Sequence, residues 1–575
     1  MKRKQLTVLI ILLLPFCVGA QNVESFFGNI RERIQSGEWI KLNGSVNAQG
    51  SFTAVSGIPP RTNPQTYRLS AAITFDILGI KAPFSASISN GNKVYKLPSY
   101  AFYGISPSYK WIKIHAGDRT MNFSPYTLSG HHFRGGGVEL TPGKFRFSAM
   151  YGQLKRAVAE DLDNRQNLET AYKRTGWGIK TGYDDGSNHY LFVLFQAKDD
   201  STSIPALTQL PVNLRPQENT VLGLQIKQTL GSVLSLEADY AFSGQTRNAA
   251  SSLINEKSIG FLKKMGGLYK PKTSSGYYHA MNTKLNVRTK FGTLNFKYER
   301  IDPYFRSLGT LFFANDRENF TAGVNTSLLK KKITLSANAG VEHNNLSAQD
   351  DNTNNRFIGM LQASIKAGEK LGVNLSYSNT SATNRLRAVG VPFVQVDSII
   401  LVQTNQSANV NVIYNIAASK ERKSILMGNL SYQNANSIVN DEVQEDQNTT
   451  FVTGQVSYVF GLESDGIEMT TSLLVNSGQF SAATLLTIAP SFSIQKSFLA
   501  DKIQTGLVAA YSNVLTNGAI SNKVFSLTGH GDYTLLERHR ISLVFRYVNN
   551  QTSQSQSAYP IFSEFSGTLK YGFRF

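Results

Sequence analysis

The amino-acid sequence predicts an all-β protein, a single antiparallel up-and-down β-barrel of about 26 strands (range 24–28) that crosses a membrane. Three observations lead to this prediction. Apolar and polar residues alternate over long segments, short turns alternate with longer polar connections, and no later segment reaches the ~18 uninterrupted apolar residues of a spanning helix. The mean hydropathy of −0.21 agrees with it, because only alternate residues of a barrel strand meet lipid.

Residues 1–20 have the organisation of a secretory signal peptide that is cleaved. Residues 2–4 are basic, the run 6–16 is apolar, and small residues at 18–20 precede the expected cleavage site. The apolar run is shorter than the ~20 residues of a spanning helix. Cys17 is the only cysteine of the chain, so the mature protein has no thiol for catalysis, disulfides or metal binding.

Residues 21–38 are predicted to form a short helix ahead of the barrel. Their apolar side chains recur at helical spacing, at Val23, Phe26, Phe27, Ile30 and Ile34. Such a helix would either pack on the periplasmic rim of the barrel or enter the lumen as a partial plug. The sequence leaves these two positions open.

The barrel is predicted to span residues 39–575, and its first strand, 40–54, shows the pattern most clearly. Apolar residues or glycine occupy every second position without an error, and segment 67–77 repeats the alternation. Strand 40–54 is longer than an ordinary globular strand of ~5–6 residues, and it exceeds the ~9–11 residues needed to cross a bilayer. A soluble β-sandwich would have shorter strands with turns every ~8–12 residues, so the strand length favours a membrane barrel.

Twelve short turns and thirteen longer polar connections alternate along the chain, which predicts 26 strands with both ends on one side. The short turns are expected at residues 80–81, 107–108, 141–143, 184–188, 231–232, 291–292, 330–331, 368–369, 419–421, 463–466, 499–501 and 537–538. The longer connections are expected near 55–64, 91–97, 118–133, 154–172, 199–218, 244–276, 303–318, 344–355, 381–404, 435–449, 477–484, 515–522 and 551–561. Segment 97–118 is the least regular because Pro98 and Pro107 interrupt it.

The last eleven residues form a strand with an aromatic face and a terminal phenylalanine. The residues that resemble an insertion signal are Phe565, Leu569, Tyr571, Phe573 and Phe575. This strand resembles the closing strand of bacterial outer-membrane β-barrels, and we expect it to pair with strand 40–54. The whole chain resembles a porin-like outer-membrane barrel of Bacteroidota, without a motif that identifies a specific family. The resemblance implies an outer-membrane location, contact with lipid and lipopolysaccharide, and the barrel-insertion machinery as a partner.

Alternation directs many basic side chains toward the predicted lumen. The lumen-lining set is Lys41, Arg68, Lys113, Arg146, Lys227, Lys284, Arg288 and Lys297. A basic lumen would favour anions, whereas the alternative is that these are merely solvated charges near the periplasmic ends. The formal net charge of +19 is scattered along strands and not clustered among aromatics, so nucleic acid is not an expected partner.

Two connections, 118–126 and 300–309, combine arginine and aspartate with proline and aromatic residues. Loops of this kind can fold inward and narrow a lumen, and Arg119, Arg300 and Arg306 would then set the charge that a solute meets. The alternative is that long loops simply pack against one another.

No set of residues in the sequence predicts catalysis, a cofactor or a metal site. The pair His131-His132 lacks further ligands at a workable spacing, and the acidic runs 184–187 and 350–352 lack the spacing of a calcium loop. A catalytic triad, a phosphate loop or a dinucleotide fingerprint is also missing. We therefore do not expect an enzyme.

The sequence thus favours a porin-like channel for hydrophilic, and by its charge anionic, solutes. The alternative function is a non-conducting barrel that serves as a component or scaffold of an outer-membrane export or assembly complex. About 26 strands would enclose a lumen wide enough to breach the envelope if it were open. Inward loops, the N-terminal helix or a partner protein must therefore fill part of it.

Overall fold

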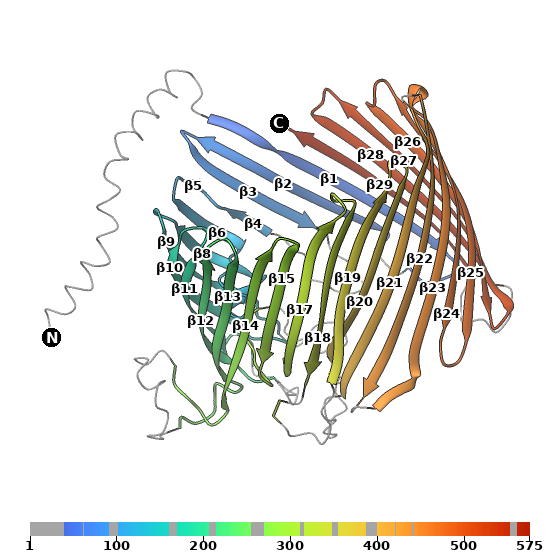
Figure 1. Ribbon diagram of the computed structural model, residues 1–575. Helices are drawn as coiled ribbons and strands as arrows, with labels where there is room; N and C mark the ends of the chain where they lie inside the picture. Colours follow the sequence, from blue (N-terminus) through green and yellow to red (C-terminus); the bar gives the residue numbers. More distant parts are fainter. Residues whose placement is uncertain are drawn as a thin grey trace, which may run out of the picture.

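The computed structural model is a closed antiparallel β-barrel (Figure 1). It describes residues 40–60, 63–90, 102–159, 170–205, 214–254, 269–310, 315–344, 346–347, 355–386, 399–419, 421–439, 442–552 and 561–575. The predicted signal peptide, 1–20, and the predicted helix, 21–38, lie outside these ranges. In the described part, no helix is both long and apolar enough to span a membrane.

The barrel wall has 26 strands, as the sequence predicts, because β4 and β5 are two segments of one wall strand between β3 and β6. The wall strands are β1 (Ile40–Ser56), β2 (Gln65–Ile77), β3 (Ile80–Ser89), β4 (Phe102–Ile105), β5 (Ser108–Tyr109), β6 (Ile112–Thr120), β8 (His132–Leu140), β9 (Phe145–Lys155), β10 (Lys173–Asp184), β11 (His189–Asp200), β12 (Glu218–Leu230), β13 (Leu234–Thr246), β14 (Ser275–Thr289), β15 (Gly292–Ile301), β17 (Arg317–Leu328), β18 (Ile333–His343), β19 (Asn355–Ala367), β20 (Leu371–Leu386), β21 (Ile399–Ala418), β22 (Arg422–Val439), β23 (Glu442–Leu462), β24 (Ile467–Gln479), β25 (Thr484–Phe498), β26 (Ile503–Thr516), β27 (Ala519–Leu535), β28 (His539–Thr552) and β29 (Phe562–Arg574). Two further short strands, β7 (Leu128–Ser129) and β16 (Gly309–Thr310), lie outside the wall, and a 3-10 turn, η3 (Glu463–Asp465), follows β23.

The short turns gather at one end of the barrel together with the start of β1 and the end of β29, at the top of Figure 1. We call this the turn end, and the opposite end, where the longer connections lie, the loop end.

Two predicted turns are displaced along the sequence. The first lies at 78–79, where Leu78 and Gly79 both have positive φ, as a tight two-residue hairpin turn requires.

The second displaced turn lies at 110–111 and not at 107–108. Pro107 is instead the point at which β4 gives way to β5 within one wall strand. Proline has no backbone N–H to donate to the ladder, so it interrupts a strand without turning the chain. Pro107 therefore marks a break within a strand and not a turn between two strands.

The connection predicted at 435–449 is also shorter than expected, because β22 and β23 continue as strands to Val439 and from Glu442. Strands β20 to β23 are 16, 20, 18 and 21 residues long, more than the ~9–11 residues that cross a bilayer. A strand that extends into water on both faces needs no apolar face, so its polar composition resembles that of a loop.

The barrel closes where β1 pairs with β29, as the closing strand predicted, in a ladder from Ser45–Arg574 to Ser56–Ser563. Backbone hydrogen bonds between Gly44 and Phe575, 2.9 and 3.1 Å long, extend the seam to the last residue. Phe52 lies over Gly567, where a Cβ atom would approach the Phe52 ring to 2.3 Å. The glycine therefore lets an aromatic ring cover the seam.

The two faces of the wall differ in polarity, as the alternation predicted. Large apolar side chains such as Phe52 (48% exposed), Leu569 (54%) and Phe357 (56%) stand on the outward face and remain about half exposed. In water such a continuous exposed apolar surface would drive association. The outward face therefore has the composition of a surface that contacts lipid.

The seam can be tested with a cysteine pair, since the chain has no cysteine besides Cys17. Ser51 and Thr568 are directly opposite each other, with their hydroxyl oxygens 3.0 Å apart. Directly opposite residues have Cα atoms ~4.5–5.5 Å apart, within disulfide range. We expect Ser51→Cys with Thr568→Cys to form a disulfide under mild oxidation. The denatured, unreduced chain would then be closed into a ring, and in gel electrophoresis it would migrate differently from the reduced, linear chain.

The matched control is Ser51→Cys with Ser566→Cys, which are diagonal neighbours on the same face. Diagonal pairs lie ~7–8 Å apart, too far for a relaxed disulfide. Equal cross-linking of both pairs, or of neither, would contradict the register of the seam.

Candidate functional site

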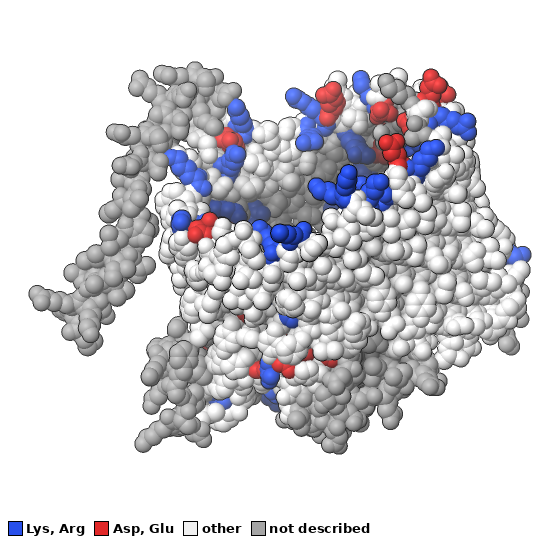
Figure 2. Space-filling model, in the orientation of Figure 1, with Lys and Arg blue, Asp and Glu red and all other residues white. Residues whose placement is uncertain are grey.

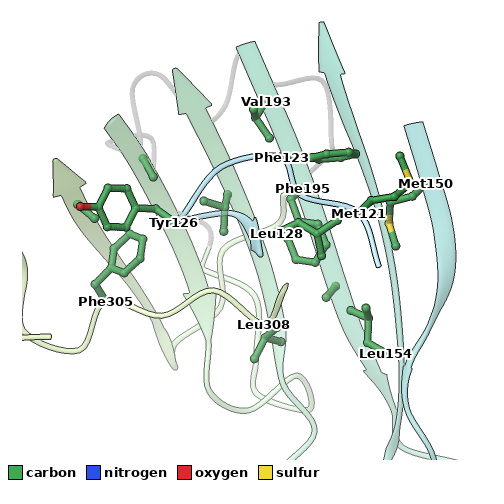
Figure 3. Close-up of a cluster of buried hydrophobic side chains, with 14 of the residues drawn as sticks. Met121, Phe123, Tyr126, Leu128, Met150, Leu154, Val193, Phe195, Phe305 and Leu308 are labelled. Carbon is green, nitrogen blue, oxygen red and sulfur yellow. The ribbon is translucent and has the colours of Figure 1, made fainter. Parts of the chain in front are cut away.

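Two connections enter the barrel from the loop end and lie against the lumen face of the wall (Figure 3). They are residues 121–131, between β6 and β8, and residues 302–310, after β15; we call them the inner loops. Their short strands β7 and β16 pair in parallel, Gly309 with Leu128 and Thr310 with Ser129. The inner loops therefore pack against each other and against the wall at the same time.

Apolar side chains from both inner loops are fully buried against the wall. Phe123 (2% exposed) and Leu128 (0%) belong to the first loop, and Phe305 (1%) to the second. They contact a wall cluster that includes Val193 and Phe195 of β11, which alternate with the outward Phe192 and therefore face the lumen. Burying a large apolar side chain contributes about 1.5–3 kcal/mol, so these contacts hold the loops firmly in place.

Glycines on the lumen face of the wall make room for the first inner loop. A Cβ atom at Gly137 would lie 2.5 Å from Met121 Sδ, and one at Gly178 would lie 2.7 Å from a ring carbon of Phe123. At Gly223 it would lie 2.9 Å from Thr127 Cγ2. The wall is therefore shaped for this loop.

Buried polar groups fix the second inner loop to the wall. The Asn219 side chain of β12 is completely buried, and its Oδ1 accepts the backbone N–H of Leu308 at 3.1 Å. Asn219 Nδ2 donates to Ser243 Oγ at 2.8 Å, and Ser243 Oγ donates to the carbonyl of Arg306 at 2.6 Å. A buried polar group left without a partner costs about 1–3 kcal/mol, so this network specifies one position of the loop.

Two charged wall residues also hold the first inner loop. Tyr126 donates its hydroxyl to Glu299 Oε1 at 3.0 Å, and Lys180 Nζ donates to the carbonyl of Phe123 at 2.7 Å. Burial, and after it the Glu299 charge, raise the pKa of the Tyr126 phenol, which therefore stays a proton donor. Both charged groups are thus engaged with the first inner loop.

All eight predicted lumen-lining residues lie on the lumen face, since each alternates along its strand with an outward apolar neighbour and aligns with lumen-facing positions of the next strand. The structure brings three of them together. Lys227, Glu237, Lys284 and Lys297 occupy successive positions of one row across β12 to β15. Lys227 forms an ion pair of 3.0 Å with Glu237, and Lys297 one of 2.9 Å with Glu299.

Other members of this set are paired as well. Lys113 Nζ lies 3.0 Å from Glu139 Oε1, which also accepts from the buried His115 at 2.6 Å. Arg146 lies 3.3 Å from Asp184. Four of the eight predicted lumen-lining residues therefore have a negative neighbour, and a role of the set in ion selection remains a prediction.

The three arginines predicted to line a constriction lie in different places. Arg119 bridges β6 to β3 on the lumen face, with NH1 3.0 Å from Ser85 Oγ and NH2 3.2 Å from the Pro83 carbonyl. Arg306 is exposed on the second inner loop.

Arg300 instead lies on the outward face of β15, 3.3 Å from Asp302. Its neighbours in sequence, Glu299 and Ile301, face the lumen and are buried. The strand continues to Ile301, so the loop begins later than the sequence suggested and Arg300 cannot line a constriction. The prediction for Arg300 does not fit its position.

The sequence alone does not reveal a large uncharged part of the lumen face. One row across ten successive wall strands consists entirely of hydroxyl and amide side chains, with one member on each strand. Its members, from β15 to β25, are Thr293, Asn325, Ser336, Gln362, Ser376, Asn409, Ser431, Thr453, Asn476 and Thr487. The adjacent row continues the pattern from β17 to β23 with Ser327, Thr334, Ser364, Asn374, Asn411, Asn429 and Gln455.

We call these two rows the polar field. Each member is visible in the sequence as a polar position of an alternating strand. Only the register between strands shows that they align into rows.

The residues predicted as an insertion signal lie on the outward face of β29, apart from Phe575, which follows the strand. Phe565, Leu569 and Tyr571 are exposed there. Phe573 packs against His539 at 4.7 Å and against Phe575 at 5.4 Å between ring centroids. Their role in insertion remains a prediction.

Within the described ranges, three or more histidine, cysteine, aspartate or glutamate side chains do not converge on a potential metal site. No family model matches the chain, and no curated protein sequence matches it. Several solved structures of outer-membrane proteins have a similar arrangement of strands at low identity.

One of these is the translocation pore of the P pilus usher PapC, with 9% identity, a TM-score of 0.39, and coverage of 93% of this chain and 99% of that one. Another is OccAB2 of Acinetobacter baumannii, with 11% identity, a TM-score of 0.30, and coverage of 68% and 98%. A third is the iron transporter FrpB of Neisseria meningitidis, with 9% identity, a TM-score of 0.36, and coverage of 92% and 81%. None of these similarities is strong enough to assign a family or a function to this chain.

The fit of the first inner loop can be tested at Gly223. We expect Gly223→Val to displace this loop, because the new side chain would overlap Thr127, and overpacking costs about 1–3 kcal/mol. Since 1.4 kcal/mol is tenfold in an equilibrium, amide hydrogen exchange over 121–131 should accelerate by about tenfold. Gly372→Val is the control, because nothing lies within 4 Å of a Cβ at that lumen-facing glycine. Similar exchange over 121–131 in both variants would contradict the packing described above.

Proposed function

We propose that this protein is an integral outer-membrane channel for hydrophilic solutes. The observation that carries the proposal is the closed wall with an apolar outward face and a lumen face that is polar over β15 to β25, away from the inner loops. In a lipid environment only a closed sheet leaves no unpaired strand edge. A polar lumen face is stable only in contact with water or a polar ligand. Both faces therefore fit a water-filled passage through an outer membrane.

The inner loops would narrow this passage from one side. They cover the lumen face of β8 to β15, where most of the paired charges lie, and they leave the polar field of β15 to β25 uncovered. Because their apolar contacts and buried hydrogen bonds fix them to the wall, we propose that they are a permanent lining and not a mobile gate. Solutes would then pass mainly along the uncharged side.

We further propose that the channel prefers anions only weakly. Four of the eight predicted lumen-lining lysines and arginines are paired with carboxylates. Figure 2 shows lysines and arginines gathered around the hollow at the turn end, with fewer acidic residues among them. Residues 330–332 of one turn are three successive lysines. This basic mouth would attract anions modestly, and the attraction would weaken with added salt.

A second candidate function is a barrel that serves as a component of an export or assembly complex, with a protein partner in its lumen. The number of strands favours this candidate, because the lumen of a 26-stranded barrel is wider than that of 16- to 18-stranded porins. The partner would be expected to occupy the side that the inner loops leave open.

Planar-bilayer recording of the purified full-length protein separates the two functions. We expect a steady conductance in symmetrical KCl, with a reversal potential in a salt gradient that indicates slight anion preference. The absence of current, together with a protein that co-purifies in a fixed ratio, would contradict the channel and support the second candidate.

The balance of charge in the lumen can be tested at Glu237. This carboxylate is the only acidic member of the row that contains Lys227, Lys284 and Lys297 across β12 to β15. We expect Glu237→Gln to leave the lysines less compensated and to shift the reversal potential toward greater anion selectivity. Glu463→Gln removes the same charge from the η3 turn, outside the row, and should shift it less. An equal shift in both variants would contradict a role for the paired row.

A further inference from the structure

The polar field is a part of the lumen face that neither the ion pairs described above nor the inner loops occupy. We infer that it binds neutral, hydroxyl-rich solutes, and that uncharged oligosaccharides are the substrate class of the channel. This inference rests on the proposed function and makes it more specific. It follows from the chemistry, the spacing and the accessibility of the polar field.

The chemistry of the polar field matches that of a sugar. An asparagine or glutamine side chain offers an acceptor and two donors in one plane, and a serine or threonine hydroxyl both donates and accepts. The hydroxyl groups of a sugar also both donate and accept, so either partner can adapt to the other. The members of both rows are of these four types alone.

The spacing also suits a chain of sugar rings. Neighbouring strands lie ~4.7–4.9 Å apart, so a row offers a new hydrogen-bonding side chain at each such step. This step is comparable to the length of one sugar ring. The second row lies beside the first, so a bound ring could be contacted along two edges.

Part of the polar field is open to the lumen. Asn325, Gln362, Asn374 and Ser376 are exposed. Other members bond within the field, such as Asn429 Nδ2 to Asn409 Oδ1 at 3.1 Å and Asn476 Nδ2 to Thr453 Oγ1 at 2.5 Å. The internal bonds orient some amides, and the exposed members remain accessible to a solute.

A groove in the wall adds an aromatic surface. It has a volume of about 830 Å³, extends from the turn between β14 and β15 to β21, and includes Asn374, Ser376 and Asn409 in its lining. Phe291 of that turn lines the same groove and is 82% exposed. The apolar C–H face of a sugar ring can pack on such an aromatic side chain. A pocket with a few polar groups that fix orientation and an apolar contact is the usual form of a small-molecule site.

Neutrality distinguishes sugars from the other candidates. The two rows themselves contain no charged residue. The nearest cations lie at their edge, Arg288 opposite Thr293 and Lys290 at the turn end of the groove. Within the rows, nothing compensates the charge of an ion. A polypeptide in transit would bring charged and apolar side chains for which the field has no complementary group. A neutral polyhydroxylated chain needs only hydrogen bonds.

The test is a titration of the purified full-length protein in detergent with maltohexaose, followed by calorimetry or ligand-observed NMR. We expect saturable binding that Asn374→Leu and Asn409→Leu each weaken by about fivefold, the typical effect of losing one hydrogen bond. Phe291→Ala should weaken it as well. Gln495→Leu is the matched control and should leave binding unchanged, because this amide is on the lumen face of β25 but outside both rows.

Failure of this inference can be told apart from failure of the channel, because binding in detergent needs no current and conductance in KCl needs no sugar. Absence of oligosaccharide binding, or equal weakening by Gln495→Leu and Asn374→Leu, would overturn the inference. Tighter binding of an uncharged Ser/Asn/Gly peptide than of maltohexaose would overturn it in favour of a polypeptide substrate.

Discussion

Pairing of every strand edge is the constraint on which the rest of this structure depends. A backbone N–H or carbonyl without a partner in an apolar medium costs several kcal/mol, so the sheet must close where β1 meets β29. Closure fixes the register of each strand with its neighbours, and the register decides which side chains share a row. The lysine row of β12 to β15 and the polar field of β15 to β25 both exist only because the register is fixed.

The lumen face is divided into two unlike parts by the inner loops. On β8 to β15 the wall carries glycines such as Gly178 and Gly223 that receive the loops, and charges such as Glu299 that bond to them. On β15 to β25 the wall carries hydroxyl and amide groups with no covering segment among the described residues. A barrel of this width therefore narrows its lumen on the side of β8 to β15 and leaves the polar field accessible.

The sequence predicts the fold to the level of strand number, because alternation is a local property that every strand displays. It also predicts the closing pair, since the ends of an up-and-down barrel must meet. Its errors arise where local composition misleads: Pro107 interrupts a strand without a turn, the polar ends of β22 and β23 remain strands, and Arg300 belongs to a strand and not to a loop. The pairing of Lys227 with Glu237 and the alignment of the polar field depend on register, which no single strand contains.

We propose that the lumen face of β15 to β25 is open to water while the outward face contacts lipid. The most direct measurement is reaction of single cysteines along β20 with a charged, membrane-impermeant thiol reagent, after reconstitution into lipid vesicles. We expect fast reaction at Asn374→Cys and Ser376→Cys and slow reaction at Val373→Cys and Leu375→Cys. Equal reaction at all four positions, or protection of Asn374→Cys and Ser376→Cys, would contradict it.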